Sequence, residues 1–228
     1  MNIDIGDDIY ESCLELIQVE VTGCCNMSCK HCRASNQPRK MINKIQMEKI
    51  LDFASKVKGE DFKFTFSGGE PFMNPNLYDY LLMAKNKGID QIVITTNASL
   101  IKDNWLKKLD DLKLPFLCIQ ISMDSINPET HNKFRGFPNA FEKCDEVLEK
   151  IKKYDNISSS IRMTITKDTI NQIDKMINYA ITKKCKILGI GSVIPFGKAS
   201  SGSISLKGLE KKKFIDIILD NKKNIMEK

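Results

Sequence analysis

The chain has 228 residues, of which 42% are hydrophobic and 28% charged, and its formal net charge is +6. This length suits one sizeable hydrophobic core, and the composition is ordinary for a globular protein in water. No apolar run approaches the roughly 20 residues that cross a bilayer, and residues 1–11 are too polar for a signal peptide. We therefore predict a cytoplasmic protein with no membrane partner.

The positive charge raises the question of nucleic-acid binding. The lysines lie mostly at helical spacing, as in Lys49, Lys56 and Lys58, and such runs usually form the solvated outer faces of helices. No recognisable nucleic-acid motif accompanies them. We therefore predict that nucleic acid is not a partner.

Short apolar runs alternate with amphipathic stretches along the whole chain. Strands are predicted at Leu16–Val21, Phe62–Phe66, Gln91–Thr95, Phe116–Ile121, Ser159–Ile165 and Lys186–Val193. Helices are predicted at Lys44–Lys56, Leu77–Asn86, Ile101–Leu109, Ala140–Ile151, Ile170–Thr182 and Leu206–Ile218, with a loop at Gly197–Gly208. This alternation indicates right-handed β-α-β units in an α/β fold with a parallel sheet, either open and doubly wound or a partial barrel.

Polar clusters come directly after several of the predicted strands. They are the cysteine run that begins near Cys24, Ser67–Pro71, Thr96–Asn97, Ser122–Asp124 and Pro195–Gly197. In barrels of parallel strands the chemistry lies at the carboxyl ends of the strands. We therefore expect these clusters to converge on one mouth.

Eight cysteines are many for a cytosolic chain, in which clustered thiols indicate a metal more often than a disulfide. Cys25-x3-Cys29-x2-Cys32 can hold three corners of a cubane iron–sulfur cluster and leave the fourth iron open. Cys24 is a competing start, but Cys25 is preferred because residues 26–28 then fill the loop. A zinc site is the alternative. The scattered cysteines are expected to be buried small hydrophobes: Cys13, Cys118, Cys144 and Cys185.

Gly68-Gly69-Glu70-Pro71 follows the second predicted strand. Its glycines let the backbone approach a ligand closely, and its carboxylate can accept hydrogen bonds from an ammonium group, although such a sequence alone is also typical of a turn. Together with the cysteine run, it resembles the radical S-adenosylmethionine (SAM) superfamily. Four further segments also resemble the peptide-modifying and cofactor-maturing branch (SPASM or twitch type) of this superfamily. They are Thr95–Asn97, Ser122–Ser125, His131–Gly136 and Pro195–Lys198.

The resemblance covers residues 14–200 and implies a partial (β/α)6 TIM-like barrel. It implies a [4Fe–4S] cluster on Cys25, Cys29 and Cys32, reductive cleavage of SAM to a 5′-deoxyadenosyl radical, and a low-potential electron donor of the flavodoxin or ferredoxin type. Arg162 is a rival of Arg135 for the carboxylate of SAM. The implied SAM-binding residues are Gly68, Gly69, Glu70, Pro71, Asn97, Ser122, Asp124 and Arg135. For Ser122 and Asp124, capping of a strand end is the alternative role.

Residues 1–228 are predicted to be one core domain, with the barrel at 14–200 and a loop and helix at 201–228. No cysteine follows Cys185, so the auxiliary-cluster domain of the SPASM-type relatives is not expected in this chain. We predict an enzyme that abstracts hydrogen from a peptide or protein. The alternatives are a radical step on a small molecule in haem or cofactor biosynthesis and a non-catalytic iron–sulfur or zinc protein.

Overall fold

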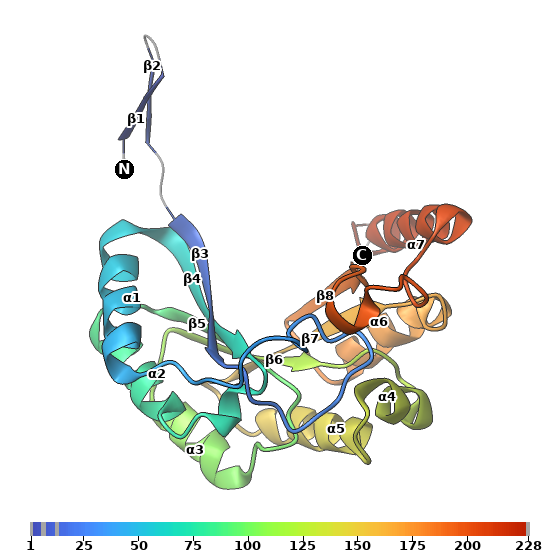
Figure 1. Cartoon of the computed structure of the whole chain (residues 1–228), viewed down its shortest axis with the longest axis horizontal. Helices are drawn as coiled ribbons and strands as arrows, with labels where there is room; N and C mark the ends of the chain where they lie inside the picture. Colours follow the sequence, from blue (N-terminus) through green and yellow to red (C-terminus); the bar gives the residue numbers. More distant parts are fainter. Residues whose placement is uncertain (1, 6–7, 12–13, 227–228) are drawn as a thin grey trace.

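The computed structural model describes residues 2–5, 8–11 and 14–226 of the chain. Six strands form one sheet: β3 (Leu14–Thr22), β4 (Lys58–Gly68), β5 (Gln91–Thr96), β6 (Phe116–Ser122), β7 (Ser158–Ile165) and β8 (Ile187–Ser192). They stand side by side in their order along the chain, and each pair is parallel. Among the described strands β3 and β8 are the two edges, so the sheet is a curved half-barrel (Figure 1). The prediction of an α/β partial TIM-like barrel is confirmed.

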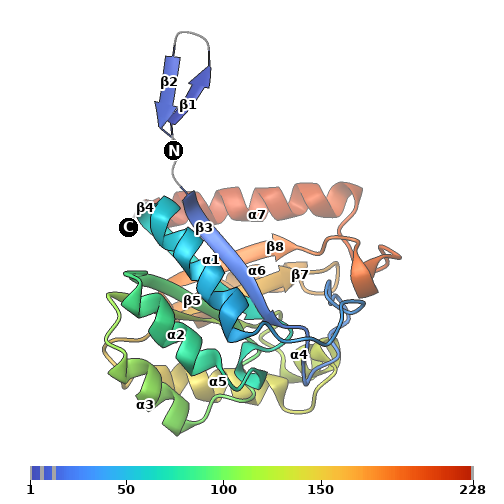
Figure 2. The same cartoon turned by 60° about the vertical axis from the view of Figure 1, so that its left-hand side comes forward.

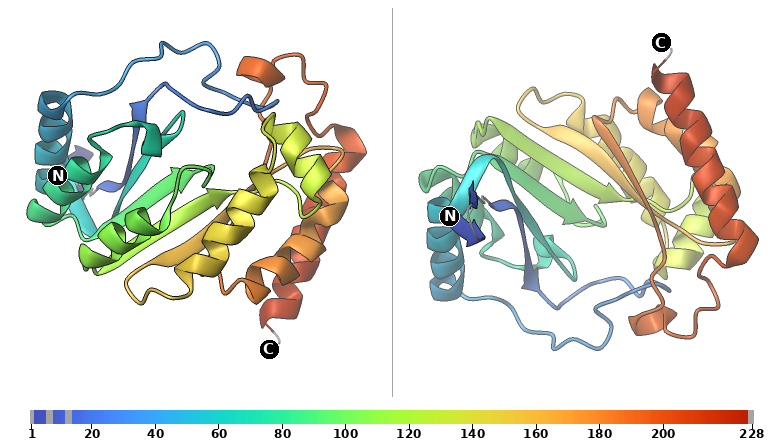
Figure 3. Two further views of the ribbon diagram at one scale, coloured as in Figure 1. Left: turned by 90° about the horizontal axis from the view of Figure 1, so that it is seen from below. Right: turned by 90° about the horizontal axis from the view of Figure 1, so that it is seen from above.

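Helices cover the convex side of the sheet (Figure 3). They are α1 (Lys44–Val57), α2 (Leu77–Asn86), α3 (Asp103–Asp111), α4 (Pro128–Arg135), α5 (Ala140–Ile151), α6 (Ile173–Thr182) and α7 (Gly208–Met226). The core lies between this helical layer and the sheet, where Phe64, Ile94 and Ile119 are fully buried. Each such side chain contributes about 1.5–3 kcal/mol of hydrophobic stabilisation.

The other, concave face of the sheet carries more polar than apolar side chains; the apolar ones include Leu16, Val93, Phe116, Cys118 and Ile187. Because side chains alternate along a strand, the residues between the buried ones share this second face, which we call the inner wall. Three side-chain contacts cross neighbouring strands there: Gln18 Nε2 donates to Ser67 Oγ (3.0 Å), Thr95 Oγ1 to Gln120 Oε1 (3.1 Å), and Cys118 Sγ to Ser160 Oγ (3.3 Å). The polar residues of the inner wall are Gln18, Glu20, Lys63, Thr65, Ser67, Gln91, Thr95, Gln120, Ser122, Ser158, Ser160, Arg162 and Thr164.

The predicted elements agree with the observed ones to within a few residues at most of their ends. The helix predicted at Ile170–Thr182 begins as a short 3-10 turn, η2 (Ile170–Gln172), and a second 3-10 turn, η3 (Gly197–Ala199), lies in the predicted loop. Helix α4 and the hairpin of β1 (Asn2–Ile5) with β2 (Asp8–Glu11) were not predicted. The hairpin stands apart from the half-barrel (Figure 2).

Within the described residues, none of the helices combines the length and the apolar character needed to cross a membrane.

Candidate functional site

The two sequence motifs meet at the carboxyl ends of β3 and β4. We call residues 23–40, which follow β3, the cysteine loop. Gly69 N donates to Thr22 O (2.7 Å), and Glu70 N donates to Cys24 O (2.8 Å). A Cβ atom on Gly69 would lie only 2.1 Å from Cys24 O, so only glycine permits this approach. Two of the strand-end clusters that were predicted to converge therefore meet here.

N–H groups contact the sulfur atoms of two of the three predicted cluster ligands. Cys25 Sγ accepts from Met27 N (3.5 Å) and lies 3.9 Å from Asn97 Nδ2, while Cys29 Sγ lies 3.8 Å from Arg135 Nη1. Cys24 Sγ instead donates to the Arg39 carbonyl (3.5 Å). Donors directed at sulfur suit thiolates that share the negative charge of an iron–sulfur cluster. This donor set therefore fits a cluster that begins at Cys25.

Burial raises the pKa of the Cys25 and Cys29 thiols, although Arg135 partly opposes this rise at Cys29. Both thiols therefore hold their protons in the free protein at neutral pH, and binding of a cluster would have to displace these protons. Within residues 2–5, 8–11 and 14–226, no three His, Cys, Asp or Glu side chains converge closely enough to hold a single ion. The assignment of Cys25, Cys29 and Cys32 as cluster ligands stays a prediction.

Glu70 is fully buried and caps the 3-10 turn η1 (Pro71–Met73). Its carboxylate accepts hydrogen bonds from Thr96 Oγ1 (2.7 Å), Asn97 N (2.8 Å) and Phe72 N (3.2 Å). Burial raises its pKa to about 7 even though these donors favour the ionised form. The side chain of Glu70 therefore ties the end of β4 to the end of β5.

Asn97 continues this connection to the cysteine loop. It is buried, and its Nδ2 donates to Asn26 Oδ1 (3.0 Å), while its Oδ1 accepts from Ser99 N (3.0 Å). The next residue, Ala98, adopts a left-handed φ of 65°. Asn97 thus fixes the position of the loop beside Cys25.

Asp124 and Arg135 form a buried ion pair. Arg135 Nε lies 2.7 Å from Asp124 Oδ2, and the two side chains are 8% and 1% exposed. The pKa of Asp124 is lowered: burial alone would raise it, but the guanidinium of Arg135 has the opposite and larger effect. The pKa of Arg135 is raised: burial alone would lower it, but the negative charges of Asp124 and Cys29 raise it. The second carboxylate oxygen of Asp124 accepts from Thr164 N (2.9 Å).

The predicted SAM-binding residues therefore divide into two groups. Glu70, Pro71, Asn97, Asp124 and Arg135 are buried beneath the cysteine loop. Gly68, Gly69 and Ser122 are partly exposed.

Arg162 belongs with the accessible group. It is exposed on β7, next to Ser122 in the sheet register. Its guanidinium extends over Gly189 and Gly191 of β8, where a Cβ on Gly191 would lie 3.1 Å from Nη2. These two glycines leave space for the arginine on the inner wall.

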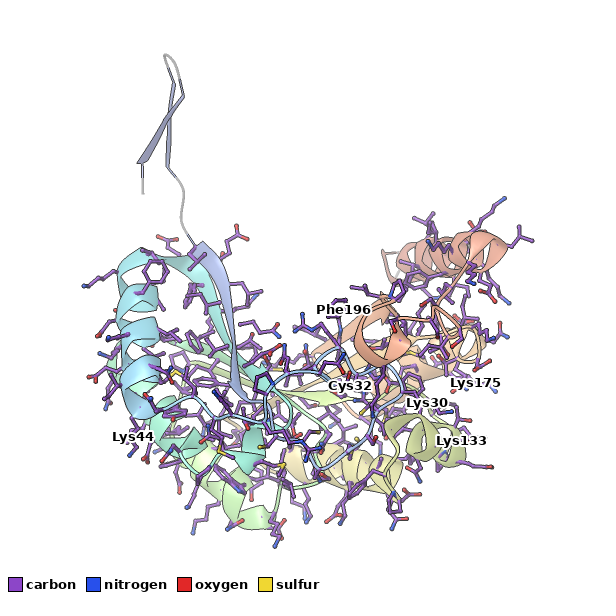
Figure 4. All side chains as sticks on the ribbon, viewed as in Figure 1. Lys30, Cys32, Lys44, Lys133, Lys175 and Phe196 are labelled. Atoms are coloured by element: carbon purple, nitrogen blue, oxygen red, sulfur yellow. The ribbon has the colours of Figure 1, made fainter. Side chains whose placement is uncertain are left out.

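The turn after β8 closes against the cysteine loop, as expected for Pro195–Gly197. Lys198 N donates to Cys32 O (3.1 Å), and Lys198 Nζ donates to Ser28 Oγ (2.6 Å). A Cβ on Gly197 would lie 2.4 Å from Cys32 O. Figure 4 labels Cys32 of the cysteine loop and Phe196 of the turn after β8.

The scattered cysteines follow the expectation in part. Cys118 and Cys144 are buried, whereas Cys185 is only half-buried. Cys13 lies outside the described residues.

His131 is fully buried. The sequence placed it within the His131–Gly136 motif but predicted no role for its side chain. Its Nδ1 accepts from Asp124 N (3.2 Å), and its Nε2 lies 4.0 Å from Cys144 Sγ. Burial lowers its pKa to about 4, with a further lowering from Arg135 and an opposing effect of Asp124. The folded protein therefore holds His131 neutral.

Acid is expected to destabilise the folded protein through His131. Its ordinary pKa of 6.5 applies after unfolding, so the unfolded chain binds the proton first and stability is lost as the pH falls from 6.5 towards 4. Between about pH 7.5 and about pH 5.5 this residue should remove about 1 kcal/mol from the free energy of unfolding. Urea unfolding of wild type and of His131→Gln at both pH values measures this effect. The difference in the free energy of unfolding between the two proteins should change by this amount between the two pH values. A difference that is the same at both pH values contradicts the assignment.

Both a protein-family model and individual proteins of known name match this chain. Residues 19–180 match the Radical SAM superfamily. AdoMet-dependent heme synthase of Methanosarcina barkeri is 28% identical over 185 residues, covering 80% of this chain and 52% of that protein. The antilisterial bacteriocin subtilosin biosynthesis protein AlbA of Bacillus subtilis is 24% identical over 183 residues, covering 78% of this chain and 39% of that protein.

A solved structure shares the fold. SuiB of Streptococcus suis, in its crystal structure with the precursor peptide SuiA, gives a TM-score of 0.78 at 17% identity over 94% of this chain and 47% of that chain. The chain spans about half the length of the curated relatives it matches.

Proposed function

The chain belongs to the radical SAM superfamily, whose members are enzymes that use a [4Fe–4S] cluster and SAM, and we propose that it cleaves SAM reductively with a cluster held by Cys25, Cys29 and Cys32. One observation carries this proposal. The backbone of Gly69 and Glu70 is hydrogen-bonded to Thr22 and Cys24, so the cysteine loop and the Gly-Gly-Glu-Pro motif form a single unit. Cys25, Cys29 and Cys32 would hold such a cluster on the loop that the partly exposed backbone of Gly68 and Gly69 adjoins.

When bound, the cluster and SAM supply the low-potential electron transfer that breaks the sulfonium C–S bond and yields a 5′-deoxyadenosyl radical. The protein binds and orients these groups. We propose that the carbonyl oxygens of Gly68 and Gly69, which are partly exposed residues, accept hydrogen bonds from the methionyl ammonium. Ser122 and Arg162, adjacent on the inner wall, are proposed to donate to the methionyl carboxylate, because Arg162 is the accessible arginine there. The proposed SAM-binding surface is held in place by buried residues that lie behind it: Glu70, Asn97, Asp124 and Arg135.

The proposed substrate is a peptide or protein. The inner wall offers hydroxyl, amide and charged side chains from every strand between β3 and β7, which suits the hydrogen-bonding groups of a polypeptide. The relative AlbA acts in the biosynthesis of a bacteriocin, that is, of an antibacterial peptide or protein. The second candidate is a tetrapyrrole, which is supported by the 28% identity to a heme synthase.

We also propose a partner and a compartment. Cleavage of SAM requires an external electron, so a low-potential donor of the flavodoxin or ferredoxin type is the proposed partner, with the cytoplasm as its site of action.

The test is anaerobic reconstitution with iron and sulfide, followed by reduction with dithionite in the presence of SAM. We expect 5′-deoxyadenosine and methionine in equal amounts, measured by chromatography. A protein with a full cluster and no such product would contradict the enzyme assignment.

The same assay separates the two substrate classes. A precursor peptide encoded beside the gene and an iron coproporphyrin are added in turn. The true substrate should accelerate formation of 5′-deoxyadenosine and change its own mass, and acceleration by the porphyrin alone would contradict the peptide proposal.

A further inference from the structure

The carboxyl end of helix α4 is joined directly to the cysteine loop. The helix begins after Asn127, whose side chain accepts from Thr130 N (2.8 Å), and ends at Gly136 with a left-handed φ of 60°. The last carbonyl groups of a helix have no partner within it. Here Ser28 N donates to Arg135 O (3.2 Å), and Lys30 N donates to Phe134 O (2.9 Å). The amides on both sides of Cys29 therefore cap helix α4.

Two further contacts fix this junction. A Cβ on Gly136 would lie 2.7 Å from Ser28 O, so the helix end and the loop are in close contact. The ring of His31 stacks on Phe134, with centroids 4.8 Å apart and planes inclined by 7°. The position of Cys29 thus depends on helix α4.

The side chain of Arg135 adds a charge to this junction. One end of its guanidinium pairs with Asp124 (2.7 Å), and Nη1 lies 3.8 Å from Cys29 Sγ. Asp124 is in turn held by Thr164 N of β7. The result is a buried chain of charged and polar groups that runs from the sheet through Asp124 and Arg135 to Cys29.

We propose that Arg135 is a positioning residue that holds the Cys29 thiolate and stabilises the electron added to the cluster, with Asp124 orienting its guanidinium. This inference rests on the proposed cluster. A charge-assisted N–H···S contact stabilises negative charge on sulfur, and hydrogen bonds to sulfur raise the reduction potential of a cluster. The carbonyl end of helix α4 carries partial negative charge, which Arg135 offsets beside the cluster.

The test uses a paired variant, Asp124→Asn with Arg135→Gln, because removing one partner alone would leave an uncompensated buried charge and risk unfolding. The matched control is Glu129→Gln with Lys133→Gln, two exposed residues of the same helix with the same change of charge. Both proteins and wild type are reconstituted, and their clusters are titrated with dithionite without SAM, monitored by electron paramagnetic resonance.

We expect the paired variant to show a more negative midpoint potential, equivalent to about tenfold in the reduction equilibrium for one charge-assisted hydrogen bond. The control should match wild type. An unchanged potential in the paired variant, with only its affinity for SAM reduced in equilibrium binding, would contradict this inference and would favour a contact with the SAM carboxylate. A wild-type protein that takes up no cluster would contradict the proposed function as well.

Discussion

Cys25→Ala is expected to abolish both the iron–sulfur chromophore and SAM cleavage, whereas Cys24→Ala is expected to keep both. The two residues are adjacent in sequence, but their contacts differ. Cys25 Sγ lies among N–H donors from Met27 and Asn97, which suit a thiolate on iron. Cys24 Sγ donates to a carbonyl oxygen of the cysteine loop. Iron and sulfide content, absorbance near 400 nm and 5′-deoxyadenosine formation measure the difference.

This pair of variants tests where the ligand triad begins, because both remove one thiol from the same loop. Loss of the cluster in Cys24→Ala with retention in Cys25→Ala would reverse the assignment. Equal retention in both would indicate that the site does not hold a three-cysteine cluster.

Gly69→Ala is expected to lower the free energy of unfolding by about 3 kcal/mol and to remove SAM cleavage. The added methyl group would lie 2.1 Å from Cys24 O, and the atom that must move belongs to the backbone of the cysteine loop. Moving it breaks the hydrogen bond from Glu70 N to Cys24 O. Urea unfolding and the 5′-deoxyadenosine assay measure the two effects.

Gly202→Ala provides the control for this prediction. Gly202 has a left-handed φ of 66°, but nothing lies within 4 Å of the added Cβ. The cost is therefore only backbone strain of about 1–2 kcal/mol, and SAM cleavage should persist. If Gly69→Ala retained its cluster and its activity, the two motifs would not act as one unit.

The sheet was predictable because its strands and helices carry clear hydrophobic patterns, as in Gln91–Thr96, where buried and half-exposed residues alternate. Helix α4 lacks this signal. Of its eight residues only His131, Phe134 and Arg135 are buried. Its sequence signals lie at its two ends: Asn127-Pro128 at the beginning and Gly136 at the end. This pattern is typical of a short capped helix.

The motifs of the site were predictable, but the partners of their side chains were not. Glu70 and Thr96 are 26 residues apart, and Arg135 and Cys29 are 106 apart. Contacts over such separations depend on the packing of whole strands and helices. The family resemblance assigned Asp124 and Arg135 independently to a cofactor, whereas the structure pairs them with each other.

The strand order also has a consequence for how the chain folds. Within the six-stranded sheet every strand pairs with its neighbour in sequence, so this sheet can grow one β-α unit at a time, with mostly short loops to close. The cysteine loop is made early, but its contacts with Arg135 and Lys198 require segments made much later; Lys198 and Ser28 are 170 residues apart. The loop therefore reaches its final shape only when the last units have folded. We therefore expect insertion of iron and sulfide to follow completion of the half-barrel.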